Sequence, residues 1–234
     1  MERHFEQELE KLNRRILKMG NLVYDQVHNA LEALLTGNLE LAQQVVGLDN
    51  KVDKLDVKID KLCQRIFALT QPVATDLRLI MSALKMNNDL ERLGDLAVNI
   101  AGKVEGVSDY PEILTELHVD DLANMADIIV KDVVTILATR NTTFVKDIFT
   151  SATAIEEKVQ AVSGRILDEM MHKTEVIVVA TNLMIILTQI DRIAGYSTNI
   201  AESIVFIVDG KMIKHKNPFK QINAASPETP QEDE

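Results

Sequence analysis

Apolar residues spaced alternately three and four positions apart constrain this chain more than any other feature. The spacing is strict in one stretch, through Val45, Leu48, Val52, Leu55, Ile59, Leu62, Ile66 and Leu69. Such a pattern places the apolar side chains on one side of a helix and is typical of long helices that pack lengthwise on one another. A similar pattern runs from Phe5 to Leu34. The sequence therefore predicts an all-α fold.

Turn-forming residues divide the pattern into six long helices. Thr36, Gly37 and Asn38 interrupt it first, and Pro72 suits the first turn of a third helix, where its missing N–H costs nothing. This third helix extends to about Val104. The segment 107–119 follows Gly106, contains Ser-Asp and Pro signals near its start and is predicted to be an irregular linker. Three further apolar patterns follow, in Leu122–Ile136, Ala152–Ile166 and Ile177–Val208.

The second half of the pattern repeats the first. Asp191, Arg192, Ile193, Asn199, Ile200 and Ala201 match Glu91, Arg92, Leu93, Asn99, Ile100 and Ala101, while Glu156, Lys158 and Val159 match Asp49, Lys51 and Val52. We therefore expect two tandem three-helix bundles, the product of an internal duplication. The predicted boundaries are 1–106 for the first bundle, 107–119 for the linker, 120–209 for the second bundle and 210–234 for a disordered tail.

Composition limits the classes of function. The net charge of -11 disfavours nucleic acid, whose phosphates require clustered Lys and Arg. The single cysteine, Cys63, excludes an internal disulfide and is expected to be a buried, inert thiol. The first residues lack the apolar core of a secretory signal, so a cytoplasmic location is expected. The most apolar run, Val176–Ile190, contains polar residues and is shorter than the ~20 residues of a membrane span, which predicts a buried helix.

The stretch Asn87–Gly102 carries the strongest candidate site. Glu91 and Asp95 are four residues apart, so their carboxylates lie on the same face of the third helix, and they repel each other unless a cation lies between them. Asp49 and Asp53 have the same spacing on the second helix. If the two helices are antiparallel neighbours, the four carboxylates converge on one cation. Two polar neighbours on the third helix, Asn88 and Asn99, are predicted to be accessory residues of this site.

The donor set predicts the kind of cation. Carboxylates without adjacent His or Cys suit Mg, Mn or iron better than Zn, and the identity of the metal stays open. A second interpretation of the acids on the second helix is a solvated face paired with Lys51, Lys54, Lys58 and Lys61. Spacing alone leaves both interpretations open.

The second repeat lacks half of this donor set. Gln160 replaces Asp53 and Gly195 replaces Asp95, which leaves Glu156 and Asp191 as single acids. A metal site there is predicted to be weak or absent.

An enzyme is the alternative interpretation, in the form of a carboxylate-bridged metal bundle. Glu169 with His172 has the Glu-x-x-His spacing of ferritin-like sites, and Asp25 with His28 is an Asp variant. Both pairs are better explained as exposed helix residues. The sequence shows no phosphate-binding Gly-rich loop, nucleophile elbow or Cys-His pairing, which disfavours catalysis.

Three stretches resemble the PhoU family of phosphate-signalling proteins: QPVATDLR (71–78), NNDLERLGDLAVNIA (87–101) and DRIAGYSTNIAE (191–202). The resemblance spans both repeats and implies two similar three-helix bundles. It also implies a non-enzymatic cytoplasmic regulator that joins the ATPase subunit of the phosphate ABC transporter to a sensor histidine kinase and represses the phosphate-starvation genes.

The resemblance also bears on the metal. The family's acid-x-x-x-Asp motif is associated with bound metal and matches Asp49 with Asp53 and Glu91 with Asp95, whereas Gln160 and Gly195 depart from it. Separately, the strict apolar seam of the second helix would also serve a homodimer, which we expect.

Overall fold

The computed structural model describes residues 2–69, 72 and 74–211, and these residues form an all-helical protein without strands. Seven α-helices are present in this part of the chain: α1 (Glu2–Thr36), α2 (Leu39–Leu69), α3 (Ala74–Ala101), α4 (Pro111–Glu116), α5 (Val119–Thr139), α6 (Val145–His172) and α7 (Ile177–Asp209). Single 3₁₀ turns, Thr142–Phe144 and Thr174–Val176, precede α6 and α7. The six long helices and the duplicated three-helix unit predicted from the sequence are confirmed.

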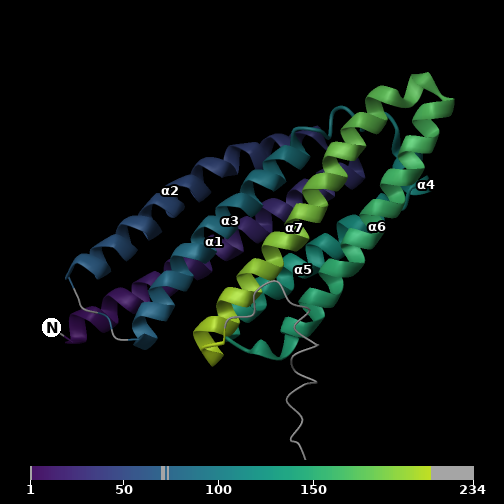
Figure 1. The fold of residues 1–234 in the computed structure, drawn as a ribbon. Helices are drawn as coiled ribbons and strands as arrows, with labels where there is room; N and C mark the ends of the chain where they lie inside the picture. Colours follow the sequence, from purple (N-terminus) through teal and green to yellow (C-terminus); the bar gives the residue numbers. More distant parts are fainter. Residues whose placement is uncertain (1, 70–71, 73, 212–234) are drawn as a thin grey trace, which may run out of the picture.

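Four of the long helices form the centre of the molecule (Figure 1). α1 packs on α3 and α5, and α7 packs on the same two helices from the other side. The remaining long helices are outermost, because α2 lies on α1 and α3 while α6 lies on α5 and α7. The two repeats therefore share one continuous apolar core.

The connection between α1 and α2 lies at the residues that the sequence predicts to interrupt the helical pattern. Gly37 has φ of +65°, a left-handed conformation that glycine adopts without strain, and it ends α1. The Asn38 side chain then accepts a hydrogen bond of 3.0 Å from the Leu41 backbone N–H at the start of α2. This tight connection makes α1 and α2 an antiparallel pair, with α2 on the outside.

The predicted linker is more ordered than expected. α4 lies inside the segment 107–119, and Val107, Leu114, Leu117 and Val119 from this segment are buried in the core. These apolar side chains explain why the segment packs down instead of forming a loose connection. Of the predicted tail, only Gly210 and Lys211 belong to the described residues, so the expectation of disorder for 212–234 lies outside them.

One helix of the described part, Thr174–Asp209, is long and apolar enough to cross a membrane by length and composition alone. In the fold this segment contains α7, which packs against α3, α5 and α6. Val179, Leu183, Ile186 and Leu187 are buried there. The predicted buried helix in Val176–Ile190 is therefore found, as a core element of the second repeat.

Candidate metal centre

The predicted acidic residues of the first repeat lie along the contact between α2 and α3. Gly94, between Glu91 and Asp95, faces side chains of both α1 and α2. A Cβ atom at this position would lie 3.1 Å from the Gln26 Oε1 atom and 3.9 Å from the Asp49 Oδ1 atom. The absence of a side chain at Gly94 thus leaves room for the Gln26 amide, and Asp49 of α2 lies beside the same position of α3.

Burial and mutual repulsion raise the pKa values of two of these acids. The pKa of Asp49 is raised first by burial and then by the charges of Asp53 and Asp95, against the opposing effect of a hydrogen bond from Gln26. The pKa of Glu91 is raised by burial and by Asp95, with smaller contributions from Asp56 and Asp53, while Arg92 opposes the change. The four predicted ligands therefore act on one another electrostatically across the two helices.

Arg92 provides the cation beside the acids of α3. Its Nε atom is 3.5 Å from Glu91 Oε2, and its Nη1 atom donates a hydrogen bond of 3.1 Å to Asp95 Oδ2. The repulsion expected between Glu91 and Asp95 is thus reduced by a neighbour in the sequence.

The donor chemistry fits a hard cation, but the carboxylates are not gathered into a cage. No group of three or more Asp, Glu, His or Cys side chains lies close enough together to hold a metal ion within the described residues. Binding of a metal would require Glu91 and Asp95 to turn from Arg92 toward the side chains of α2. The backbone places the donors on facing helices, and their side-chain conformation decides whether they converge.

Two buried amides contact the acids and were not expected from the sequence. Gln26 of α1 is fully buried, and its Nε2 atom donates hydrogen bonds of 3.4 Å to Asp49 Oδ1 and to the Val45 carbonyl. Asn87 is almost fully buried, and its Nδ2 atom lies 2.6 Å from Asp56 Oδ1 and 3.1 Å from Asp60 Oδ1. Both amides lie at the edge of the apolar seam of their helix. A polar residue at such a position is the feature of the sequence from which they could have been predicted.

The predicted accessory residues lie elsewhere on α3. Asn88 and Asn99 are both exposed, and no hydrogen bond joins either side chain to the acids within the described residues. Their role as accessory ligands stays a prediction.

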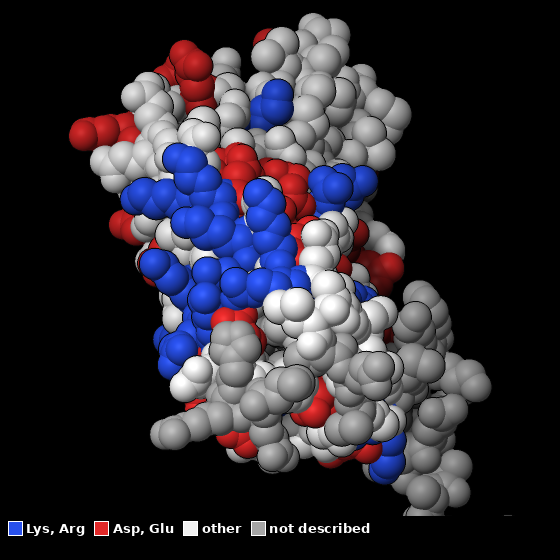
Figure 2. Space-filling model, turned by 90° about the vertical axis from the view of Figure 1, so that its left-hand side faces the viewer, with Lys and Arg blue, Asp and Glu red and all other residues white. Residues whose placement is uncertain are grey.

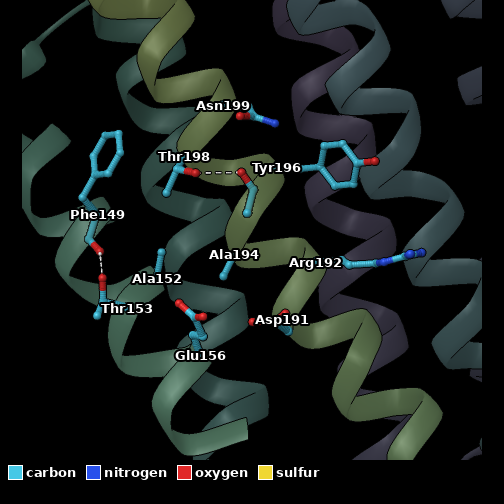
Figure 3. Close-up of a pocket in the computed structure, with 11 residues that line it drawn as sticks. Phe149, Ala152, Thr153, Glu156, Asp191, Arg192, Ala194, Tyr196, Thr198 and Asn199 are labelled. Carbon is cyan, nitrogen blue, oxygen red and sulfur yellow. Dashed lines mark hydrogen bonds between the residues drawn. The ribbon is translucent and has the colours of Figure 1, made fainter. Parts of the chain in front are cut away.

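In the second repeat, a hollow of about 600 Å³ lies between α6 and α7 (Figure 3). Glu156 of α6 and Asp191 of α7 both line it, so the fold brings together the two acids predicted for a weak second site. At Gly195, which replaces Asp95, an added Cβ atom would meet nothing within 4 Å. The side chains of Arg192 and Tyr196 extend from α7 away from α6 in this view (Figure 3). Metal binding here stays a prediction.

The ferritin-like pairs are exposed, as expected, and each His has another neighbour. His28 Nδ1 is 2.9 Å from Asp127 Oδ1 of α5, and His172 Nδ1 is 2.7 Å from the Asp168 carbonyl. The Glu169 carboxylate pairs with Lys173 at 2.8 Å. Cys63 is fully buried, and burial raises the pKa of its thiol to about 12, so the thiolate needed for reactivity is not formed.

The fold and this site define a class of protein: a duplicated all-helical protein with acids between the second and third long helices, two pairs in the first repeat and single acids in the second. The PhoU domain model matches the chain twice, at residues 16–104 and 119–204, so the chain belongs to the PhoU family. This is a non-enzymatic family of accessory and regulatory proteins, which removes the alternative of a carboxylate-bridged metal enzyme.

Individual relatives agree over nearly the whole chain. A phosphate-specific transport system accessory protein PhoU homolog of Rhizobium meliloti is 32% identical over 92% of this chain and 91% of its own length. The homolog of Aquifex aeolicus is 30% identical over 90% of this chain and 95% of its length. The crystal structure of PhoU from Pseudomonas aeruginosa superposes with a TM-score of 0.84 at 30% identity, covering 88% of this chain and all of that one. The phosphate transport system regulatory protein PhoU from Streptococcus pneumoniae gives 0.79 at 26% identity, covering 90% of this chain and all of that one.

Proposed function

We propose that this protein is a cytoplasmic adaptor that joins a phosphate ABC transporter to a sensor histidine kinase and keeps the phosphate-starvation response off when phosphate is plentiful. The observation that carries the proposal is the match of both repeats to a family whose relatives are named phosphate-specific transport system accessory proteins. The ATPase subunit of the transporter and the kinase are the proposed direct partners, and a homodimer is the proposed state of the adaptor.

A pull-down tests the adaptor role. The full chain is immobilised and offered the transporter ATPase and the kinase, separately and together, in detergent and at high phosphate. Capture of both is expected. Recovery of neither protein would contradict the adaptor role, and size-exclusion chromatography with light scattering of the free chain tests the homodimer.

We further propose that Asp49, Asp53, Glu91 and Asp95 hold a divalent or iron-type cation. Support comes from the oxygen-only donor set, the approach of Asp49 to α3 at Gly94, and the raised pKa values of Asp49 and Glu91. A bound cation would supply positive charge between the two helices. With the cation bound, the carboxylates would ionise fully, and Gln26 would keep Asp49 oriented through its hydrogen bond.

Elemental analysis tests the metal proposal. The protein is equilibrated with Mg, Mn, Fe and Zn together, dialysed and measured beside the double variant Glu91→Gln, Asp95→Asn. Metal retained by the wild type and lost from the variant is the expected result. If neither retains metal, the acids are a solvated or partner-facing surface, and the adaptor role must depend on protein contacts alone.

A further inference from the structure

A band of cations covers the outer side of α1 and α2, on a protein whose net charge is -11. Figure 2 shows Lys and Arg side chains gathered on the face of the molecule that carries α2, with Asp and Glu side chains beside them. We define the basic band as nine residues of these two helices: Lys11, Arg14, Arg15, Lys18, Lys51, Lys54, Lys58, Lys61 and Arg65. Four of them, Lys51, Lys54, Lys58 and Lys61, are the lysines that the alternative interpretation of the acids on α2 pairs with those acids.

Two contacts place the cations of α1 next to those of α2. Arg15 Nη1 donates a hydrogen bond of 2.7 Å to the backbone carbonyl of Lys58, and Arg65 pairs with Glu8. On α1, Lys11, Arg14, Arg15 and Lys18 have the spacing of one helix face. On α2, the stretch from Lys51 to Arg65 extends the band over ~21 Å. The band is therefore one continuous strip built from two helices.

Most ammonium groups of the band have no anionic partner. Lys18, Lys51, Lys54, Lys58 and Lys61 are exposed and form no ion pair with any residue that the structure describes. In the described part of the chain, the acids paired with the band are Glu8, beside Lys11 and Arg65, and Glu10, beside Arg14. Like charges gathered on one face create a positive potential that attracts an external anion.

The acidic residues of α2 lie on the far side of that helix. At ~100° per residue, the five cations of α2 fall within ~80° of arc, and the centre of the acids Asp49, Asp53, Asp56 and Asp60 is ~150° away. A helix is ~10 Å across, which is about one Debye length at physiological salt. A flat anionic surface on the basic band would therefore feel the cations much more strongly than the acids.

We infer that the basic band is a docking surface for the anionic headgroups of a lipid bilayer. A planar leaflet presents negative charge along the whole length of a straight strip, and each Lys or Arg near it adds to the attraction. Among the described residues, no large exposed aromatic side chain lies on α1 or α2, and such anchors usually dominate protein interfaces. A nucleic-acid duplex would meet a straight strip only where its phosphates cross it, and the acids of the chain would repel the rest.

This inference goes beyond the proposed function and can fail separately from it. A transporter lies in a membrane, so attachment to lipid would hold the chain beside its proposed partner and align α1 and α2 with the bilayer plane. Capture of the ATPase subunit and the kinase in detergent tests the adaptor role without lipid, whereas vesicles without protein test the band alone.

Vesicle sedimentation provides the test. The full chain is mixed, in a chelating buffer, with phosphatidylcholine vesicles and with vesicles that also contain phosphatidylglycerol. The band variant carries Lys51→Gln, Lys54→Gln, Lys58→Gln and Lys61→Gln. The control variant carries Lys131→Gln, Lys146→Gln, Lys158→Gln and Lys173→Gln on exposed positions of the second repeat, so both variants have the same net charge.

The wild type and the control should bind the phosphatidylglycerol vesicles and release them as salt is raised, while the band variant should bind about 100-fold or more weakly. Circular dichroism confirms that the variants are folded. The inference is overturned if the wild type does not prefer phosphatidylglycerol, if both variants weaken equally, or if binding appears only with added divalent cation. A further arm uses neutral phosphatidylcholine vesicles that contain the transporter. The inference is also overturned if the band variant binds more weakly than the control only in that arm, because the occupant is then a protein surface.

Discussion

The two repeats build the same contact between their second and third long helices, but they fill it differently. In the first repeat the contact between α2 and α3 is closed at Gly94, where Gln26 and Asp49 come close to the backbone. In the second repeat the equivalent contact between α6 and α7 contains a hollow of about 600 Å³ beside Gly195. Most residues of the apolar seams are buried in both repeats, although Leu69 at the end of the α2 seam is exposed. The difference shows that the apolar seams hold the helices of each repeat together, while the polar residues beside the seams can differ between the repeats.

A second contrast lies where the repeats meet. Asp89 of α3 is buried and its Oδ2 atom has no hydrogen-bond partner among the described residues, whereas α7 has the neutral Gln189 at the corresponding position. Burial, with Glu202 nearby, raises the pKa of Asp89 to about 6 although Lys85 opposes the change. The first repeat therefore carries a buried acid that the second avoids.

Removal of acids from each repeat should give the largest contrast. Glu91→Gln with Asp95→Asn is expected to weaken metal binding by about 100-fold or more, because two charged donors are lost, whereas Glu156→Gln with Asp191→Asn should leave the tightest site unchanged. Titration calorimetry with Mn measures both. Equal losses in the two variants would show that the repeats share the metal function equally.

Neutralising Asp89 should remove the next largest difference. The pKa of its carboxyl is about 6 in the folded chain against an ordinary value of 3.8, so the native state binds the proton more tightly and is disfavoured once the group ionises. The wild type is therefore expected to lose stability as pH rises from 4 through 6. Asp89→Asn should remove this loss and stabilise the protein at pH 7 by about 1–3 kcal/mol.

Urea unfolding of wild type and Asp89→Asn at pH 5 and pH 7 measures the free energy of unfolding that this prediction concerns. Asp191→Asn, in the second repeat, is the control for loss of one acid. A variant no more stable than wild type at pH 7 would contradict the prediction.

The two glycines should respond oppositely to a methyl group. Gly195→Ala places the methyl in open space within a helix and is expected to stabilise by about 0.5–1 kcal/mol. Gly94→Ala brings a Cβ atom to 3.1 Å from Gln26 Oε1, and Gln26 is fully buried, so the gain should be cancelled or reversed. Thermal unfolding of both variants compares them, and an equal gain at Gly94 would mean that the closed contact of the first repeat is loose.

An effect of similar size is expected at Asn87. Asn87→Leu copies Leu187 of the second repeat and removes the amide that donates to Asp56 and Asp60. The expected cost is about 1 kcal/mol, because both carboxylates are partly exposed and water replaces the lost donor. Urea unfolding checks this value, with Asn88→Leu, an exposed neighbour on the same helix, as the control. If Asn87→Leu leaves the free energy of unfolding unchanged, these hydrogen bonds contribute nothing to stability.

The sequence by itself determined the elements of this fold and their duplication. Apolar spacing through Val45–Leu69 and its counterparts is a local property of a helix, so six long helices could be placed without knowledge of their neighbours. The same reasoning put Glu91 and Asp95 on one face and showed that Gln160 and Gly195 interrupt the pattern. It predicted an irregular linker where the structure has the helix α4 and the buried residues Leu114 and Leu117, because the six residues of α4 are too few to reveal a period.

Only the tertiary structure decided which faces meet. Spacing along one helix contains no information on how far that helix is rotated against its neighbour, since rotation depends on how the side chains of both interlock. The contact of Gln26 with Asp49, that of Asn87 with Asp56, and the hollow beside Gly195 all arise from that packing. The basic band has the same origin, because the cations of α1 and α2 are distant in the sequence and become one surface only when the two helices lie side by side.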